Sequence, residues 1–187
     1  AQMNTLATNA SGYSDSAFEN CTSLEQISLP DKISNIGKNA FRGCTALKSI
    51  VLPAKVTQIS ENLFYGCISL ENITFKGNVT LVGSGAFYNT KYLNNSDNFE
   101  DGCLYLGTIL INVSKTAETI NVKPDTTSIY PGAFDGCASL KKLTIPGTIT
   151  HLGARVLKDC MALEELTTPW VGVSKGANAT ESAVFGA

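Results

Sequence analysis

The chain has 187 residues, of which 14 are Lys or Arg and 16 are Asp or Glu, giving a net charge of -2. This balance provides no positive surface for a polyanion, so we expect no nucleic-acid partner. No stretch is apolar over the length that spans a bilayer, and the start of the sequence has neither the basic nor the long apolar part of a signal peptide. We therefore expect no membrane insertion and no signal peptide in this chain.

A period of 23 residues organises the chain. Phe18, Phe41, Phe64 and Phe87 follow one another at this spacing, Phe134 comes 47 residues later, and Leu157 takes the same place after a further 23. Counted from this position as zero, apolar residues recur at +6, +9, +11, +15 and +18, with Cys at +3. No single helix or strand produces several columns locked to one long period. The sequence therefore predicts repeats that bury their apolar residues by stacking.

Each repeat is predicted to contain one short strand and one short helical turn. The apolar residues at +9 and +11 alternate as in a strand, and the Pro that often follows at +12 would end it because Pro lacks a donor for the sheet. Around the Phe, residues 60–66 are predicted to form one turn that Ser60 caps and Gly66 ends. The residues at +2 tolerate a left-handed backbone, which we therefore predict there. They are Asn20, Gly43, Gly66, Asn89, Gly136 and Asp159.

The step of 47 residues predicts an insertion. Ile120 and Val122 fit positions +9 and +11 of a repeat whose first half has been replaced. Within the insertion, residues 103–106 and 109–113 are expected to form two strands about the Gly107-Thr108 turn. We expect one domain over residues 1–187, with repeats at about 13–90 and 118–169, the hairpin insertion at about 91–117, and a polar C-terminal tail at 170–187.

The repeat resembles that of the BspA-like leucine-rich-repeat family of bacterial surface and secreted proteins. The resemblance rests on columns such as Ala40-Phe41, Gly43-Cys44 and Leu52-Pro53 in the order A-F-x-[GN]-C-x-x-L-x-x-I-x-L-P. It implies an α/β fold, a right-handed leucine-rich-repeat solenoid with a short strand plus a short helical or 3-10 turn per repeat. It also implies an extracellular or cell-surface location, adhesion or protein binding, and no catalysis. Thr90 departs from the Cys column, Leu157 from the Phe column and Thr168 from the aliphatic column, so an irregular ladder is expected there.

Five of the six cysteines occupy position +3: Cys21, Cys44, Cys67, Cys137 and Cys160. Neighbouring copies would lie one strand spacing apart, which disulfide geometry accepts. A small buried thiol at a fixed corner of the solenoid is the favoured interpretation. The sequence leaves both states open.

The sequence predicts no catalytic, cofactor-binding or metal-binding residues. The single histidine, His151, has no nucleophile motif beside it, and the acid pairs Glu100-Asp101 and Glu164-Glu165 lie on segments where adjacent side chains diverge. Residues 94–102 are rich in oxygen ligands but lack the spacing of a calcium loop. We therefore expect no enzyme activity and no cofactor.

The candidate partner-binding face consists of the outward strand positions +8 and +10. These residues are Gln26, Ser28, Ser49, Val51, Asn72, Thr74, Thr119, Asn121, Lys142, Thr144, Glu165 and Thr167. Expected partners are other proteins, of a host matrix or a cell surface, or surface glycans. The alternative is a structural spacer within a larger surface protein. The exposed aromatic residues expected to matter are Tyr88, Tyr92, Tyr105 and Trp170.

Overall fold

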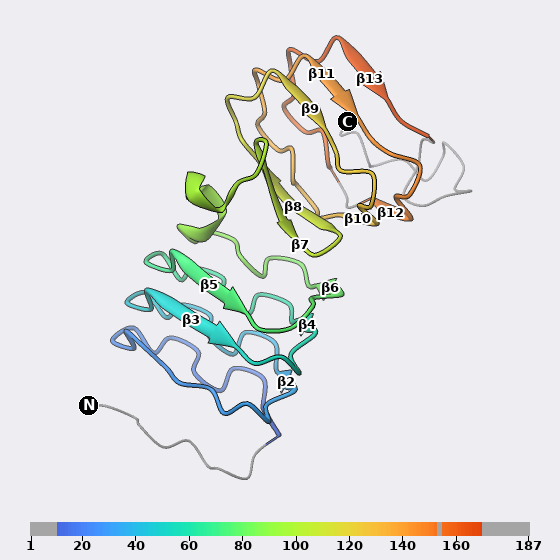
Figure 1. Cartoon of the computed structure of the whole chain (residues 1–187). Helices are drawn as coiled ribbons and strands as arrows, with labels where there is room; N and C mark the ends of the chain where they lie inside the picture. The colour runs from blue at the N-terminus through green and yellow to red at the C-terminus, as the bar shows by residue number, and fades with distance from the viewer. Residues whose placement is uncertain (1–10, 153–154, 170–187) are drawn as a thin grey trace. The chain divides into compact units, whose positions relative to one another are not determined.

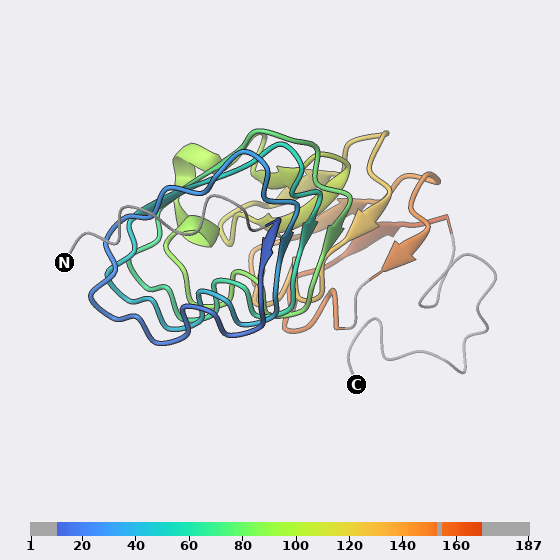
Figure 2. The ribbon, with the colours of Figure 1, turned by 90° about the horizontal axis from the view of Figure 1, so that it is seen from below.

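The computed structural model describes residues 11–152 and 155–169, and shows coils that stack one on another (Figures 1 and 2). The predicted tail at 170–187, with Trp170, lies outside the described residues. The chain divides into two compact units, Ala1–Asn95 and Ser96–Ala187. A single domain over the whole chain stays a prediction.

The first unit carries two rows of parallel strands. In one row, β3 (Ser49–Leu52) pairs with β5 (Asn72–Phe75). In the other row β1 (Gly12–Tyr13) pairs with β2 (Asn35–Ile36), and β4 (Gln58–Ile59) pairs with β6 (Leu81–Val82). Each register joins residues 23 positions apart, so the sequence period is the step from one coil to the next. The unit ends with the 3-10 helix η1 (Tyr92–Asn94).

The second unit begins with the 3-10 helix η2 (Ser96–Asn98) and the predicted hairpin. Strands β7 (Cys103–Leu106) and β8 (Ile109–Val113) pair antiparallel, and Gly107 has the left-handed φ of 57° that a tight hairpin turn uses. Two rows of parallel strands follow. One contains β9 (Thr119–Asn121), β11 (Lys142–Thr144) and β13 (Glu165–Thr167), and the other contains β10 (Ser128–Ile129) and β12 (His151–Leu152).

The hairpin is more closely integrated than the sequence suggested. Strand β8 pairs in parallel with β10, with Ile109 opposite Ser128 and Leu110 opposite Ile129. Every residue of β8 is buried. The insertion therefore supplies β8, the first parallel strand of this solenoid sheet. Ile120 lies opposite Leu143, which confirms that the regular repeat resumes at position +9.

The segments around the Phe residues are hydrogen-bonded turns rather than helices. The amide of Cys67 donates to the carbonyl of Phe64 at 3.0 Å, but the amide of Phe64 donates to Ala86 of the next repeat at 2.8 Å. Because successive amides alternate between their own turn and the neighbouring coil, no helix can continue. The predicted side-chain cap is wrong, since the Ser60 hydroxyl donates to the carbonyl of Ile36 in the preceding repeat.

The predicted left-handed column at +2 is confirmed at all six positions, with φ between 57° and 72°. A second left-handed column lies at −2, which the sequence analysis missed. Its members are Ser16, Asn39, Asn62, Gly85, Gly132 and Arg155. Each Phe, and Leu157 in the last repeat, therefore lies between two left-handed residues. These residues let the short turn place the Phe or Leu side chain inside the solenoid.

The aromatic column forms a continuous stack in the first unit. Ring centroids are 5.0 Å apart for Phe18 and Phe41, 5.8 Å for Phe41 and Phe64, and 6.1 Å for Phe64 and Phe87. All four are buried. Burial of such a side chain stabilises the fold by roughly 1.5–3 kcal/mol, so this column is a main source of stability.

The fourth repeat departs from the pattern after Phe87. Tyr92 is only 5% exposed, and its ring lies 5.5 Å from that of Phe87. It takes the interior place expected for Leu93, which is half-buried. The prediction of an exposed Tyr92 is therefore wrong, because η1 replaces the regular segment and turns the chain by a different amount.

Candidate functional site

All twelve residues of the predicted partner-binding face are exposed. In the first unit the pairing of β3 with β5 sets Ser49 beside Asn72 and Val51 beside Thr74. In the second unit Lys142 lies between Thr119 and Glu165 along the sheet. Each unit thus presents neighbouring strands whose outward side chains are in register.

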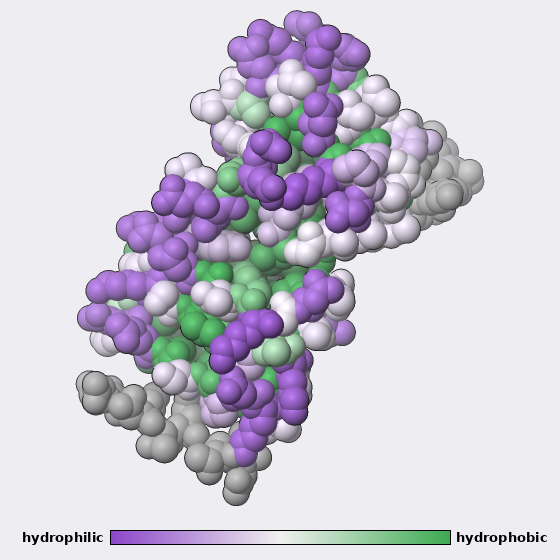
Figure 3. Space-filling view, viewed as in Figure 1, coloured by the Kyte–Doolittle hydropathy of each residue, from purple (hydrophilic) through white to green (hydrophobic). Residues whose placement is uncertain are grey.

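The chemistry of this face is polar, with one larger apolar side chain. Val51, at 45% exposure, is the only large aliphatic residue among the twelve, and none of the twelve is aromatic. One face of the molecule in Figure 3 likewise shows hydrophilic side chains intermixed with hydrophobic ones. Such a surface lacks the aromatic anchors that concentrate binding energy, so its contacts would be spread over many residues.

Ion pairs link equivalent positions of successive coils. Lys142 Nζ lies 2.8 Å from Glu165 on the predicted face, and the hydrogen bond to Glu165 raises the pKa of Lys142. Lys141 pairs with Glu118 at 2.9 Å in the same unit. These side chains are exposed, so solvent screens the pairs and each contributes little to stability. The pairs were not predicted, although opposite charges 23 residues apart were the signal in the sequence that could have revealed them.

An aromatic stack lies on the surface of the first unit at position +1. The rings of Tyr65 and Tyr88 are 4.9 Å apart, and the guanidinium of Arg42 lies 5.3 Å from the centre of the Tyr65 ring. Arg42 also pairs with Glu19 at 3.2 Å. Tyr88 is 59% exposed, as predicted, whereas Tyr105 is half-buried and accepts a hydrogen bond from the Lys123 amide.

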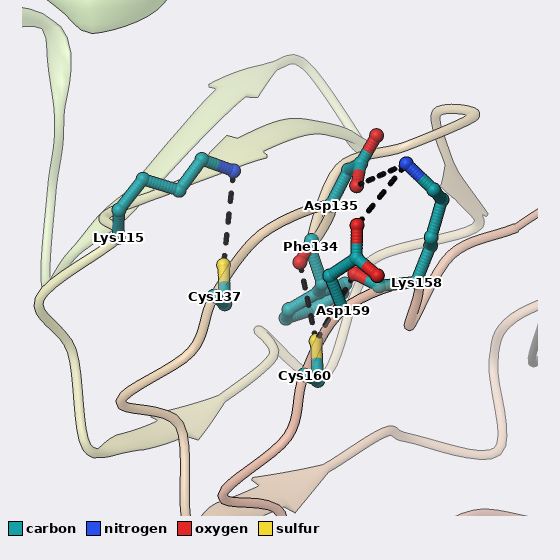
Figure 4. A network of polar contacts seen from close by, with 7 residues as sticks. All are labelled: Lys115, Phe134, Asp135, Cys137, Lys158, Asp159 and Cys160. Carbon is teal, nitrogen blue, oxygen red and sulfur yellow. Dashed lines mark hydrogen bonds and ion pairs between the residues drawn. The ribbon is translucent and has the colours of Figure 1, made fainter.

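The six cysteines are free thiols, and three of the five at +3 donate a hydrogen bond to the preceding coil. The Cys44 thiol donates to the carbonyl of Phe18 at 3.1 Å, and that of Cys67 donates to Phe41 at 2.9 Å. In the second unit Cys160 makes the same bond to Phe134 at 3.2 Å (Figure 4). A thiol at this corner therefore serves as a hydrogen-bond donor to the preceding repeat.

The ladder is interrupted at Thr90, as expected from the substitution of Cys. The Thr90 hydroxyl donates to the carbonyl of Phe87 in its own repeat at 2.8 Å, instead of reaching the preceding one. The bond between coils is lost at the place where the regular repeats of the first unit end.

Burial keeps the thiols of Cys137 and Cys160 protonated. Burial raises the pKa of Cys137, although Lys115 Nζ lies 3.7 Å from its sulfur and favours the thiolate. Burial raises the pKa of Cys160 to about 11. Because the thiolate is the reactive form, Cys137 and Cys160 are poor nucleophiles at neutral pH.

An ion-pair cluster lies near these cysteines. Lys158 lies between Asp135 and Asp159 and pairs with both (Figure 4).

Two of the candidate catalytic groups are engaged in ion pairs. Glu100 pairs with Lys123 at 2.6 Å, and Glu165 pairs with Lys142. His151 belongs to the short strand β12. Within residues 11–152 and 155–169, no cluster of three or more His, Cys, Asp or Glu side chains could hold a metal ion. No helix in that part of the chain is long and apolar enough to cross a bilayer.

Comparison with known proteins identifies the repeat. The family model described as the BspA type leucine rich repeat region matches in six copies over residues 11–129 and 111–179. No curated protein sequence matches the chain.

Several solved structures are similar. The pneumococcal vaccine antigen PcpA gives a TM-score of 0.53 at 18% identity, over 86% of this chain and 49% of that chain. A leucine rich cell surface protein from Faecalibacterium prausnitzii A2-165 gives 0.49 at 21% identity, over 84% and 58%. A leucine rich repeat protein from T. pallidum gives 0.47 at 26% identity, over 81% and 71%. The chain thus spans less than two thirds of the length of PcpA and of the Faecalibacterium prausnitzii protein. PcpA shares the fold of this chain.

Proposed function

Because the chain belongs to the BspA-type leucine-rich-repeat family, we propose that it is a non-enzymatic binding module that recognises an extended protein partner through its outward strand positions. The observation that carries this proposal is the register of the strand faces. Equivalent polar side chains, such as Ser49 and Asn72, stand beside one another on adjacent coils. An elongated partner can therefore meet chemically similar positions repeatedly along each unit.

A location outside the cell, with an adhesive role, is part of the same proposal. It is supported by the family and by a charged fraction of only 16%. The absence of enzyme activity is supported by protonated thiols and by carboxylates held in exposed ion pairs. Turnover of a glycosidase, esterase or peptidase substrate that disappears in His151→Ala, with the fold intact, would overturn this part of the proposal.

The binding proposal is tested with the intact chain and a solubilised extracellular-matrix extract. Captured proteins are identified, and the affinity of the strongest is measured. Single changes Asn72→Ala and Thr74→Ala should each weaken binding by about 1 kcal/mol or less, while Ser49→Glu combined with Thr74→Glu should weaken it much more. Gln58→Glu, on β4 in the other row of strands, is the matched control. Equal loss in the control and in the double variant would remove the strand face from consideration.

A structural spacer within a larger surface protein is the second candidate. It is favoured by the finding that the chain spans only 49% and 58% of two similar structures. In that case the strand-face variants would leave every interaction of the longer protein unchanged, and removal of its other domains would abolish binding.

A further inference from the structure

A hollow of about 340 Å³ opens in the first unit at the end of its last repeat. This volume lies near the lower end of the range of roughly 300–1,000 Å³ found for small-molecule pockets. The residues that line it include Ile68, Glu71, Asn89, Lys91, Asn94 and Asn95. They come from two successive coils.

The hollow arises from the irregular end of the first unit. Ile68 and Lys91 hold equivalent positions on adjacent coils, and so do Glu71 and Asn94. In the preceding coils these positions lead from the Cys corner into a strand. After Thr90 the corner bond to the preceding coil is missing, and η1 follows in place of the regular segment. The two coils remain joined by hydrogen bonds from the Gly66 amide to the Tyr88 carbonyl, at 2.9 Å, and from the Tyr92 amide to the Leu70 carbonyl, at 2.7 Å. The hollow opens at this irregular corner.

The lining suits a ligand with several hydroxyl groups. The amides of Asn89 and Asn94 each contain a donor and an acceptor, which matches the dual character of a hydroxyl group. Glu71 and Lys91 carry opposite charges, so the two charges among these residues cancel. Ile68 is 49% exposed and supplies an apolar contact for the C–H groups of a ring. Tyr88, 59% exposed, directly precedes Asn89.

Other ligand classes fit this lining less well. A phosphate group would meet one lysine and one carboxylate, with no surplus of positive charge. The hollow is lined by one acidic residue, Glu71, whereas oxygen-bound cations such as calcium take six to eight ligands and commonly several carboxylates. An uncharged polyol retains both the hydrogen bonds and the charge balance.

We infer that this hollow binds one neutral pyranose sugar, either free or at the end of a glycan. None of the twelve residues of the strand face lines the hollow, so different variants test the two proposals. Asn89 and Asn94 hold the hydroxyl groups, and Ile68 covers one side of the ring.

The test uses the whole chain and ligand-observed saturation-transfer NMR with glucose, galactose, mannose, N-acetylglucosamine and the acidic sugar sialic acid. At least one neutral sugar should bind, and titration should then give its dissociation constant. Asn89→Gly removes one amide from the hollow and retains a residue suited to the left-handed φ of 57°. This variant and Asn94→Ala should each weaken binding about three- to tenfold, the loss expected for one hydrogen bond.

Asn20→Gly is the matched control, since Asn20 occupies the same repeat position with φ 59° and does not line the hollow. It should leave the dissociation constant unchanged, and thermal unfolding verifies that all three variants fold. A glycoprotein with the same terminal sugar, compared with its deglycosylated form, tells a glycan ligand from a free sugar. Binding of sialic acid alone, no binding of any neutral sugar at about 10 mM, or binding that survives both pocket variants would overturn the assignment.

Discussion

At the scale of single residues, the left-handed backbone positions carry much of the fold's specificity. Asn and Gly recur at these positions because Gly accepts the left-handed conformation freely and Asn does so at small cost. The sequence made the +2 column predictable, since all six of its members are Gly, Asn or Asp. The −2 column was missed because Ser16 and Arg155 interrupt the pattern. The amide of Ser16 donates to the carbonyl of Lys38 in the next coil, which holds the left-handed conformation there.

Two of these glycines allow a matched test. Gly43 and Gly66 have φ of 70° and 72°, but a Cβ on Gly43 would collide with the amide oxygen of Asn20, whereas nothing lies within 4 Å of one on Gly66. Gly66→Ala should therefore cost about 1–2 kcal/mol of unfolding free energy from the backbone alone. Gly43→Ala should cost about 1 kcal/mol more from the collision. Urea unfolding measures both, and equal losses would mean that Asn20 moves away freely.

The buried Tyr92 phenol predicts a loss of stability in alkali. Burial raises the pKa of Tyr92 from 10.0 to about 12. Ionisation is thus easier in the unfolded chain, so this contribution is complete below pH 10 and falls as the pH rises toward 12. The loss should reach about 2 kcal/mol near pH 12.

Unfolding free energies between pH 9 and pH 12 check this prediction. Tyr92→Phe should remove that part of the pH dependence, because Phe has no proton to lose. The exposed Tyr88→Phe is the control and should follow the parent chain. A parallel decline in all three proteins would assign the alkaline loss to other groups.

At the scale of elements, the stacked Phe column should dominate the stability of the first unit. Phe64 is fully buried between Phe41 and Phe87, so Phe64→Ala leaves a cavity that rigid neighbouring coils cannot close. We expect a cost of about 3–5 kcal/mol, against less than about 0.5 kcal/mol for the exposed Gln26→Ala. Chemical denaturation compares the two, and similar costs would contradict the assigned interior column.

The predictability of each element follows from how local its causes are. The hairpin at 103–113 was predictable because two short apolar runs flank a Gly-containing turn. Its pairing with β10 was not, since parallel pairing of β8 depends on a segment that is distant in the sequence. Tyr92 replaced Leu93 in the interior because the 3-10 helix η1 changes which side chain points inward.

The candidate sites divide in the same way. The strand face was predictable because exposure at +8 and +10 follows directly from alternation in a repeated strand. The hollow beside Asn89 and Asn94 was not, since it depends on where the repeat fails. The sequence signal available was Thr90, whose departure from the Cys column marks the position of that failure.

At the scale of the whole molecule, the ion pairs add little net stability. Pairs such as Lys38 with Glu61, at 3.0 Å, are solvent-exposed and screened by salt. Their regular placement at one period nevertheless leaves each coil with charges that match its neighbours, which favours the correct stacking register over a shifted one.

The constant register between coils has a consequence for the gene. Loss of residues 42–64 by in-frame recombination would join Phe41 directly to Tyr65, and every later column would keep its phase. We expect this shortened chain to fold with a cooperative thermal transition, whereas loss of residues 42–63 should not, because one extra residue displaces the following columns. Calorimetry of the two deletions decides the matter. Unequal crossing-over between repeats is therefore a mutational route by which descendants of this gene can change length while still encoding a folded protein.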